Sequence, residues 1–187
     1  MAFKPVGIDE NSLFPDRVET RLSTTFALLS DSVFIPAREF SPTVGSPAQT
    51  TVSSSFSALA FDAAASEYVM TLADLPPEWA TLTLTLHWVN LGAGAGNVLW
   101  VWDYIHLGDG DSIAGTPFTA GLGVARTAPA QNVLRVTLTE FSTPQPAIPA
   151  PSGSRLLGLR IRRMGADALD TLPNDAGLFG VTLTKVS

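Results

Sequence analysis

The fold class is decided by TLTLTLHW (residues 81–88) and VLWVWDYI (residues 98–105), two stretches that a glycine-rich segment separates. Successive side chains of a β-strand point to opposite faces, so the three leucines and Trp88 of the first stretch share one face, and its threonines and His87 share the other. This alternation is typical of a half-buried strand in an antiparallel sheet. Because a strand and not a helix follows, Gly92 to Gly96 is predicted to be a hairpin turn and not a phosphate-binding loop.

The second stretch is apolar on both faces. Its tryptophans and Tyr104 share one face, whereas Leu99, Val101 and Ile105 lie on the other. A monomeric sheet with one wet side would expose too much apolar surface there, so we predict that these three residues form a subunit interface of a homotrimer. The alternative is a β-rich monomer.

Short alternating segments and turn residues recur at even spacing from Ser32 onward, which predicts a β-sandwich or barrel. We expect eight or nine strands, near residues 32–40, 55–62, 67–73, 81–90, 97–108, 117–125, 133–142, 155–164 and 178–186. The alternating positions predict a core of Phe61, Leu82, Leu84, Leu86, Trp88, Trp100, Val136, Leu138, Leu159, Ile161, Val181 and Leu183.

Residues 1–30 differ from the rest and are predicted to form an extended N-terminal arm, with residues 31–187 as the β-sandwich domain. The arm has at most one short helix, from Phe14 to Leu22. Its scattered apolar residues need another surface to bury them, so we expect docking on a partner, with disorder as the alternative. The predicted anchors are Phe3, Ile8, Leu13, Phe14 and Val18.

Composition excludes several classes of function. The 187 residues contain no cysteine, which excludes disulfides and thiolate metal sites. A net charge of -6 argues against a nucleic-acid surface, and no apolar stretch is long enough to cross a membrane or to act as a signal sequence. We therefore expect no nucleic-acid or membrane partner and synthesis in a cytoplasm. Charged residues are only 15% of the chain, which suits a surface that packs in an assembly.

No catalytic, cofactor-binding or metal-binding residue is predicted, so the chain is not expected to be an enzyme. His87 and His106 lack further ligands at metal-site spacing. Residues 108–112 are interpreted as a turn, with a bound cation as the alternative. The acids Asp62, Glu67, Asp103 and Glu140 are too scattered to indicate a glycosidase pair, and no serine has the setting of a nucleophile.

Four tryptophans suggest a second use of the fold. Trp79, Trp88, Trp100 and Trp102 would stack on sugar rings if they were exposed, as in a lectin-like sandwich. Three of the four lie at alternating strand positions, which also fits core or subunit contacts.

An arginine cluster precedes a group of acids. Arg155, Arg160, Arg162 and Arg163 are predicted to pair with Asp167, Asp170 and Asp175, within the chain or across an interface. We assign Arg160 and Arg162 to the subunit interface.

The order of motifs resembles jelly-roll structural domains of tailed-bacteriophage particles. The resemblance covers roughly residues 55 to 187 and rests on LTLTLHW, GNVLWVWDY, GDGD, RLLGLRIRR, DALDT and AGLFGVTL. It implies an all-β antiparallel jelly-roll sandwich, usually trimeric, in a head decoration (cement) protein or a tail fibre. A fibre usually has shafts or repeats beyond such a domain, so we expect a noncatalytic decoration protein on the capsid surface of the virion, with the major capsid protein as partner. The alternative is a receptor-binding module that recognises host surface glycans.

Overall fold

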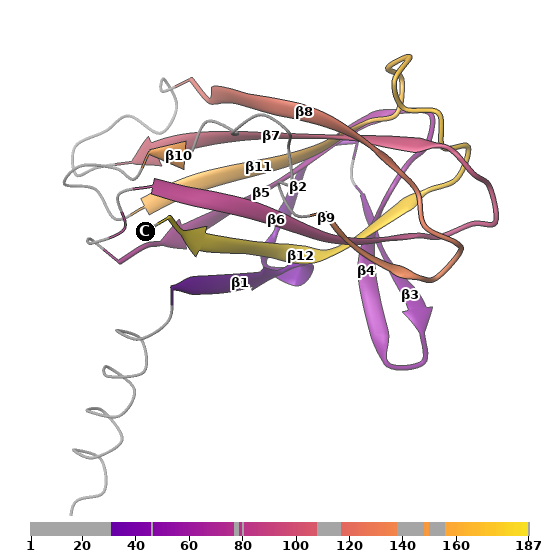
Figure 1. Ribbon diagram of the computed structural model, residues 1–187, viewed down its shortest axis with the longest axis horizontal. Helices are drawn as coiled ribbons and strands as arrows, with labels where there is room; N and C mark the ends of the chain where they lie inside the picture. Colours follow the sequence, from indigo (N-terminus) through magenta and orange to yellow (C-terminus); the bar gives the residue numbers. More distant parts are fainter. Residues whose placement is uncertain are drawn as a thin grey trace, which may run out of the picture. The chain divides into compact units, whose positions relative to one another are not determined.

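The computed structural model describes residues 31–45, 47–76, 79, 81–107, 117–137, 148–149 and 156–186. Within these residues the chain forms two antiparallel sheets that pack face to face (Figure 1). Residues from Ser32 onward belong to one compact unit. This arrangement confirms the predicted all-β jelly-roll sandwich.

The seven-stranded sheet has the order β10-β6-β12-β4-β3, with β1 paired to β12 and β9 paired to β6. Its strands are β1 (Ser32–Pro36), β3 (Ala48–Ser53), β4 (Phe56–Phe61), β6 (Thr81–Asn90), β9 (Leu134–Thr137), β10 (Ile148–Pro149) and β12 (Ala176–Lys185). The β3–β4 hairpin extends away from the body of the sandwich (Figure 1).

The five-stranded sheet has the order β2-β5-β11-β7-β8. Its strands are β2 (Ser41–Val44), β5 (Ser66–Asp74), β7 (Asn97–Leu107), β8 (Thr119–Thr127) and β11 (Leu156–Met164). A single 3₁₀ turn, η2 (Ala37–Glu39), carries the chain from β1 in one sheet to β2 in the other. That turn divides the single strand that we predicted over residues 32–40.

The core lies between the two sheets. Trp88 of β6 and Trp100 of β7 are fully buried, and their rings meet edge to face with centroids 5.9 Å apart. The ring of Phe61 packs on Trp100 in the same manner at 5.2 Å. Such edge-to-face contacts add to the free energy gained by burying three large rings.

Ten of the twelve predicted core residues are buried. Val136 is the wrong one, with 43% of its surface exposed. It lies on the short strand β9 opposite His87, whose side chain faces away from the core. Leu138 lies outside the described residues.

The predicted hairpin at Gly92 to Gly96 is also wrong, because β6 and β7 belong to different sheets. The side chain of Asn90 shapes the connection: its amide donates to the carbonyl of Gly94 at 2.9 Å and its oxygen accepts from the N–H of Gly92 at 3.0 Å. A Cβ on Gly92 or Gly94 would overlap the side chain of Asn174. The glycines therefore permit a close approach to Asn174 and do not form a tight turn between paired strands.

Three described strands, β2, β3 and β10, were not predicted. The sequence of β3, AQTTVS, has little apolar alternation because most of its side chains are exposed on the projecting hairpin. Period-two patterning reports burial on one face, so it misses strands that bury neither face.

Candidate functional site

The five residues predicted to form a subunit interface lie together on the outer face of the five-stranded sheet. Leu99, Val101 and Ile105 project from β7, and Arg160 and Arg162 project from the adjacent strand β11. In the register, Arg162 lies opposite Val101.

Asp103 holds the two arginines on this face. It is only 1% exposed, and its carboxylate accepts from Arg160 Nε at 2.7 Å and from Arg162 Nη2 at 2.8 Å. The Arg160 guanidinium also stacks on Phe118, 4.4 Å from the ring centroid, and lies 5.4 Å from that of Tyr68. From the sequence alone, Asp103 is only one of four scattered acids. Its outward position on an apolar strand face was the signal that would have linked it to the arginines.

Two residues of this outer face are already buried without a partner subunit. Leu99 and Ile105 are each 6% exposed within the single chain. Gly158 contributes to this cover, since its open Cβ position lets the Ile105 side chain lie against β11. A homotrimer through this face therefore stays a prediction.

A second ionic centre lies in the interior. The five N–H groups of Arg163 donate five hydrogen bonds of 2.8–3.0 Å: two to the Asp170 carboxylate and one each to the carbonyls of Phe61, Leu172 and Asn174, with Nη1 and Nη2 each donating twice. Both side chains of the ion pair are completely buried. This confirms the predicted ion pairing within the chain for Arg163 and Asp170.

The other predicted acidic partners have different contacts. Asp175 accepts from the backbone N–H of Ala63, and Asp167 accepts from that of Leu169. Arg155 lies outside the described residues.

The scattered carboxylates form no open acid pair in the described part of the chain. Glu67 is buried, and its carboxylate accepts from the backbone N–H of Asp62 at 2.6 Å. Burial raises the pKa of Glu67, although the Asp62 hydrogen bond acts in the opposite direction. Asp103 is occupied by the arginines, and Glu140 lies outside the described residues.

The tryptophans proposed to stack on sugars are all buried, so that interpretation is wrong. Trp88 and Trp100 fill the core, and Trp79 and Trp102 belong to the same cluster. Among the described residues the exposed large aromatic side chains are instead Phe34 and Phe56, which sequence patterning did not single out.

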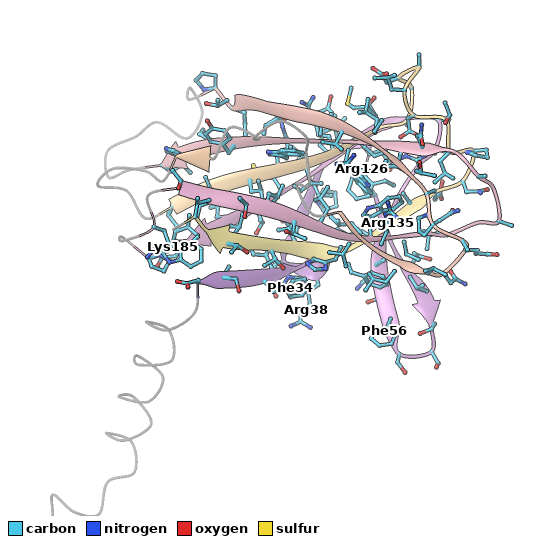
Figure 2. All side chains as sticks on the ribbon, in the orientation of Figure 1. Phe34, Arg38, Phe56, Arg126, Arg135 and Lys185 are labelled. Carbon is cyan, nitrogen blue, oxygen red and sulfur yellow. The ribbon has the colours of Figure 1, made fainter. Side chains whose placement is uncertain are left out.

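These two phenylalanines line an apolar groove of about 580 Å³ on the seven-stranded sheet, which we call the phenylalanine groove. Its walls come from six strands and from Asn132, which precedes β9: Phe34, Val52, Ser53, Phe56, His87, Asn132, Leu134 and Phe179. Phe34 is 54% exposed and Phe56 65%. Both lie toward the side of the molecule formed by β1 and the β3–β4 hairpin (Figure 2).

His87 is the titratable group of the groove. Its ring lies edge-on to Phe34, with centroids 5.4 Å apart, and its Nε2 is 2.8 Å from the hydroxyl of Thr182. Burial lowers the pKa of His87, so the imidazole is neutral at pH 7. The groove is thus uncharged as well as apolar.

Several expectations are not tested by these contacts. The arm anchors Phe3, Ile8, Leu13, Phe14 and Val18 lie outside the described residues, as does the turn predicted at residues 108–112 with its alternative of a bound cation. In the described part of the chain, no three His, Asp or Glu side chains gather as metal ligands, and no helix is long and apolar enough to span a bilayer.

The chain is similar in outline to three solved structures. One is the C-terminal CBM6 of LamC, a laminarinase from Zobellia galactanivorans, with 10% identity, a TM-score of 0.46, and coverage of 82% of this chain and 99% of that chain. Another is the Clostridium thermocellum endo-1,4-β-D-xylanase 10B CBM22-1 and GH10 modules, with 11% identity, a TM-score of 0.49, and coverage of 83% and 28%. The third is the enzymatically active domain of tailspike protein 4 of bacteriophage CBA120, with 9% identity, a TM-score of 0.39, and coverage of 86% and 20%.

No protein-family model matches the chain, and no curated protein matches it in sequence. The chain spans less than a third of the xylanase and tailspike chains. TM-scores below 0.5 at about a tenth identity transfer neither a ligand nor an activity to this chain.

Proposed function

We propose that this chain is a noncatalytic structural protein of a bacteriophage particle, a head decoration protein that binds the outer capsid surface as a homotrimer. The observation that supports it best is the exposed, uncharged phenylalanine groove on a sandwich in which Asp103 and Asp170 are paired with arginines. Such a body is suited to burying apolar surface against protein, because little charge has to be desolvated.

A decoration protein stabilises a shell by mass action. Its contacts with the major capsid protein exist only in the assembled shell, so its binding free energy raises the resistance of the shell to heat or internal pressure. In this proposal the arm, residues 1–30, supplies the capsid contacts through Phe3, Ile8, Leu13, Phe14 and Val18. Many identical copies compensate for a modest affinity at each site.

Placing charges on two anchors should detach the protein from heads. We expect the variant with Phe14→Asp and Val18→Asp to bind purified heads at least about tenfold more weakly than the unmodified chain, because two apolar side chains lose their pockets. Occupancy is measured by co-sedimentation with heads over a protein titration. Deleting residues 1–30 should abolish binding.

A variant with Thr24→Asp and Thr25→Asp is the matched control, since it adds the same charge to the arm away from the anchors. It should bind as the unmodified chain does. Full occupancy by the anchor variant would overturn the role assigned to the arm, and localisation of the intact protein to tail tips would overturn the decoration role.

A glycan-binding module of a tail fibre is the second candidate, and one observation favours it. Phe34 and Phe56 present exposed ring surface beside the polar side chains of His87 and Asn132, and apolar sugar faces stack on aromatic rings. This candidate predicts binding to host surface oligosaccharides that Phe56→Ala weakens by roughly tenfold, measured by calorimetry with soluble fragments. Equal binding by both proteins would exclude the groove as the glycan site.

A further inference from the structure

Arg160 and Arg162 share a single counter-charge on the outer face of the five-stranded sheet. Both guanidinium groups bind the carboxylate of Asp103, and in the described part of the chain they form salt bridges with that carboxylate alone. The residues opposite them in the register include no further acid: Tyr68 and Met70 on β5, and Val101 and Asp103 on β7. Two positive charges beside one negative charge leave one positive charge uncompensated.

The same two arginines use few of their hydrogen-bond donors. A guanidinium has five N–H groups, but among the described residues Arg160 donates only through Nε and Arg162 only through Nη2. The Nε of Arg162 is buried without an acceptor. Arg163 on the same strand, by contrast, donates five hydrogen bonds. Arg160 and Arg162 therefore lack acceptors as well as negative charge, and such a shortage in a folded chain calls for an explanation.

The two guanidinium groups are held in place and are still accessible. The side chains of Arg160 and Arg162 are 25% and 19% exposed, whereas that of Asp103 is 1% exposed. Arg160 lies over the ring of Phe118, and Arg160 and Arg162 lie 5.4 and 5.6 Å from the ring centroid of Tyr68. Contact with a ring occupies the face of a guanidinium and leaves the N–H groups at its edge free to donate. A ligand would thus meet fixed donors, and Asp103 is too buried to compete as an acceptor.

We infer that this face binds an acidic polysaccharide, with the carboxylate of a hexuronate held by Arg160 and Arg162. A carboxylate supplies the missing negative charge and the missing acceptors, and its planar shape matches the guanidinium fork. The partly exposed rings of Tyr68 and Phe118 beside the donors favour a sugar over an acidic peptide. A pyranose ring presents an apolar face that packs on an aromatic ring, and in a hexuronate the carboxylate is attached to that same sugar ring.

The net charge of -6 does not prevent this binding. At physiological ionic strength, exposed charges more than about 8 Å apart are largely screened from one another, so the charge balance at the two arginines decides. The inference goes beyond the proposed function and requires that this face is open, so a homotrimer would form through another face. Its failure would leave the decoration role untouched, because that role assigns head binding to the arm.

Arg160→Lys in the full-length protein tests the site. A lysine keeps a positive charge beside Asp103 but loses the planar fork of donors. The probes are oligomers of galacturonate, mannuronate and glucuronate, titrated by calorimetry. We expect the unmodified protein to bind at least one of them, and Arg160→Lys and Arg162→Lys each to weaken that binding at least about tenfold. The neutral methyl ester of the same oligomer should also bind the unmodified protein at least about tenfold more weakly.

Arg38→Lys is the matched control, because Arg38 is exposed on η2 and its salt bridge in the described part of the chain is with Glu39. It should bind as the unmodified protein does, and circular dichroism should show that all variants are folded. Failure of every hexuronate oligomer to bind, or unchanged binding by Arg160→Lys and Arg162→Lys or by the methyl ester, would overturn the inference. Equally tight binding of oligoglutamate would overturn the assignment to a sugar. Loss of binding in Phe56→Ala but not in the two lysine variants would place the site in the phenylalanine groove instead.

Discussion

Asp170→Asn is expected to lower the free energy of unfolding by about 3–5 kcal/mol, because it leaves the buried guanidinium of Arg163 without a counter-charge. The two side chains are completely buried and joined by two hydrogen bonds of 2.8 and 3.0 Å. An asparagine keeps the shape of the side chain but presents an NH₂ group to a donor-only guanidinium. The Asp170 carboxylate also accepts from the backbone N–H of Leu99 at 3.0 Å, so the substitution disturbs the start of β7 as well.

Urea unfolding at pH 7, followed by circular dichroism, measures this loss. Asp167→Asn is the control: it removes the same charge from the same connection, where Asp167 is exposed and its carboxylate accepts a hydrogen bond from the backbone N–H of Leu169. Its effect should stay within about 0.5 kcal/mol. Equal stabilities of the two variants would show that the buried pair contributes far less than its geometry implies.

The sequence predicted best where one face of a strand is buried. Strand β6 begins and ends at the predicted residues 81 and 90, and β7 ends one residue before its predicted end. In β6, alternation reflects a real difference between a core face and an outer face. The alternation does not show which strands pair, because pairing depends on contacts between residues that are distant in the sequence. The prediction of a hairpin at Gly92 to Gly96 was wrong for this reason.

The candidate surfaces were predictable only in part. Period-two geometry correctly placed Leu99, Val101 and Ile105 on one face but could not show that the chain covers two of them itself. Likewise the arginines were recognised as ion-pairing groups, but Asp103 was missed, because it lies 57 residues before Arg160 and meets it only through the pairing of β7 with β11.

The phenylalanine groove was missed for a related reason. Its residues come from β1, β3, β4, β6, β9 and β12, and no local motif joins them. The signal that was present is compositional: the outward positions of β6 and β12 are Thr, His, Val, Phe and Gly without a single charge. A search for uncharged outer faces, and not only for apolar inner ones, would have found it.

A buried aromatic residue stabilises the fold, whereas an exposed one is available for binding. Comparing Trp100→Ala with Phe56→Ala tests this difference. Trp100 is fully buried between Phe61 and Trp88, so its truncation should cost about 3–5 kcal/mol of unfolding free energy through lost contacts and the cavity left behind. Phe56 is largely exposed on the projecting hairpin, and its truncation should cost less than about 1 kcal/mol in the dissociated chain.

Urea unfolding of both variants at a concentration where the unmodified protein is monomeric measures the difference, and binding assays then separate the roles. Phe56→Ala should weaken contacts made through the phenylalanine groove while leaving the fold intact. Trp100→Ala should lower the free energy of unfolding and should reduce binding only to the extent that the protein unfolds. A stable Trp100→Ala protein would contradict the described core. A strongly destabilised Phe56→Ala protein would mean that the ring packs within its own chain, and the groove would then no longer be an open contact surface.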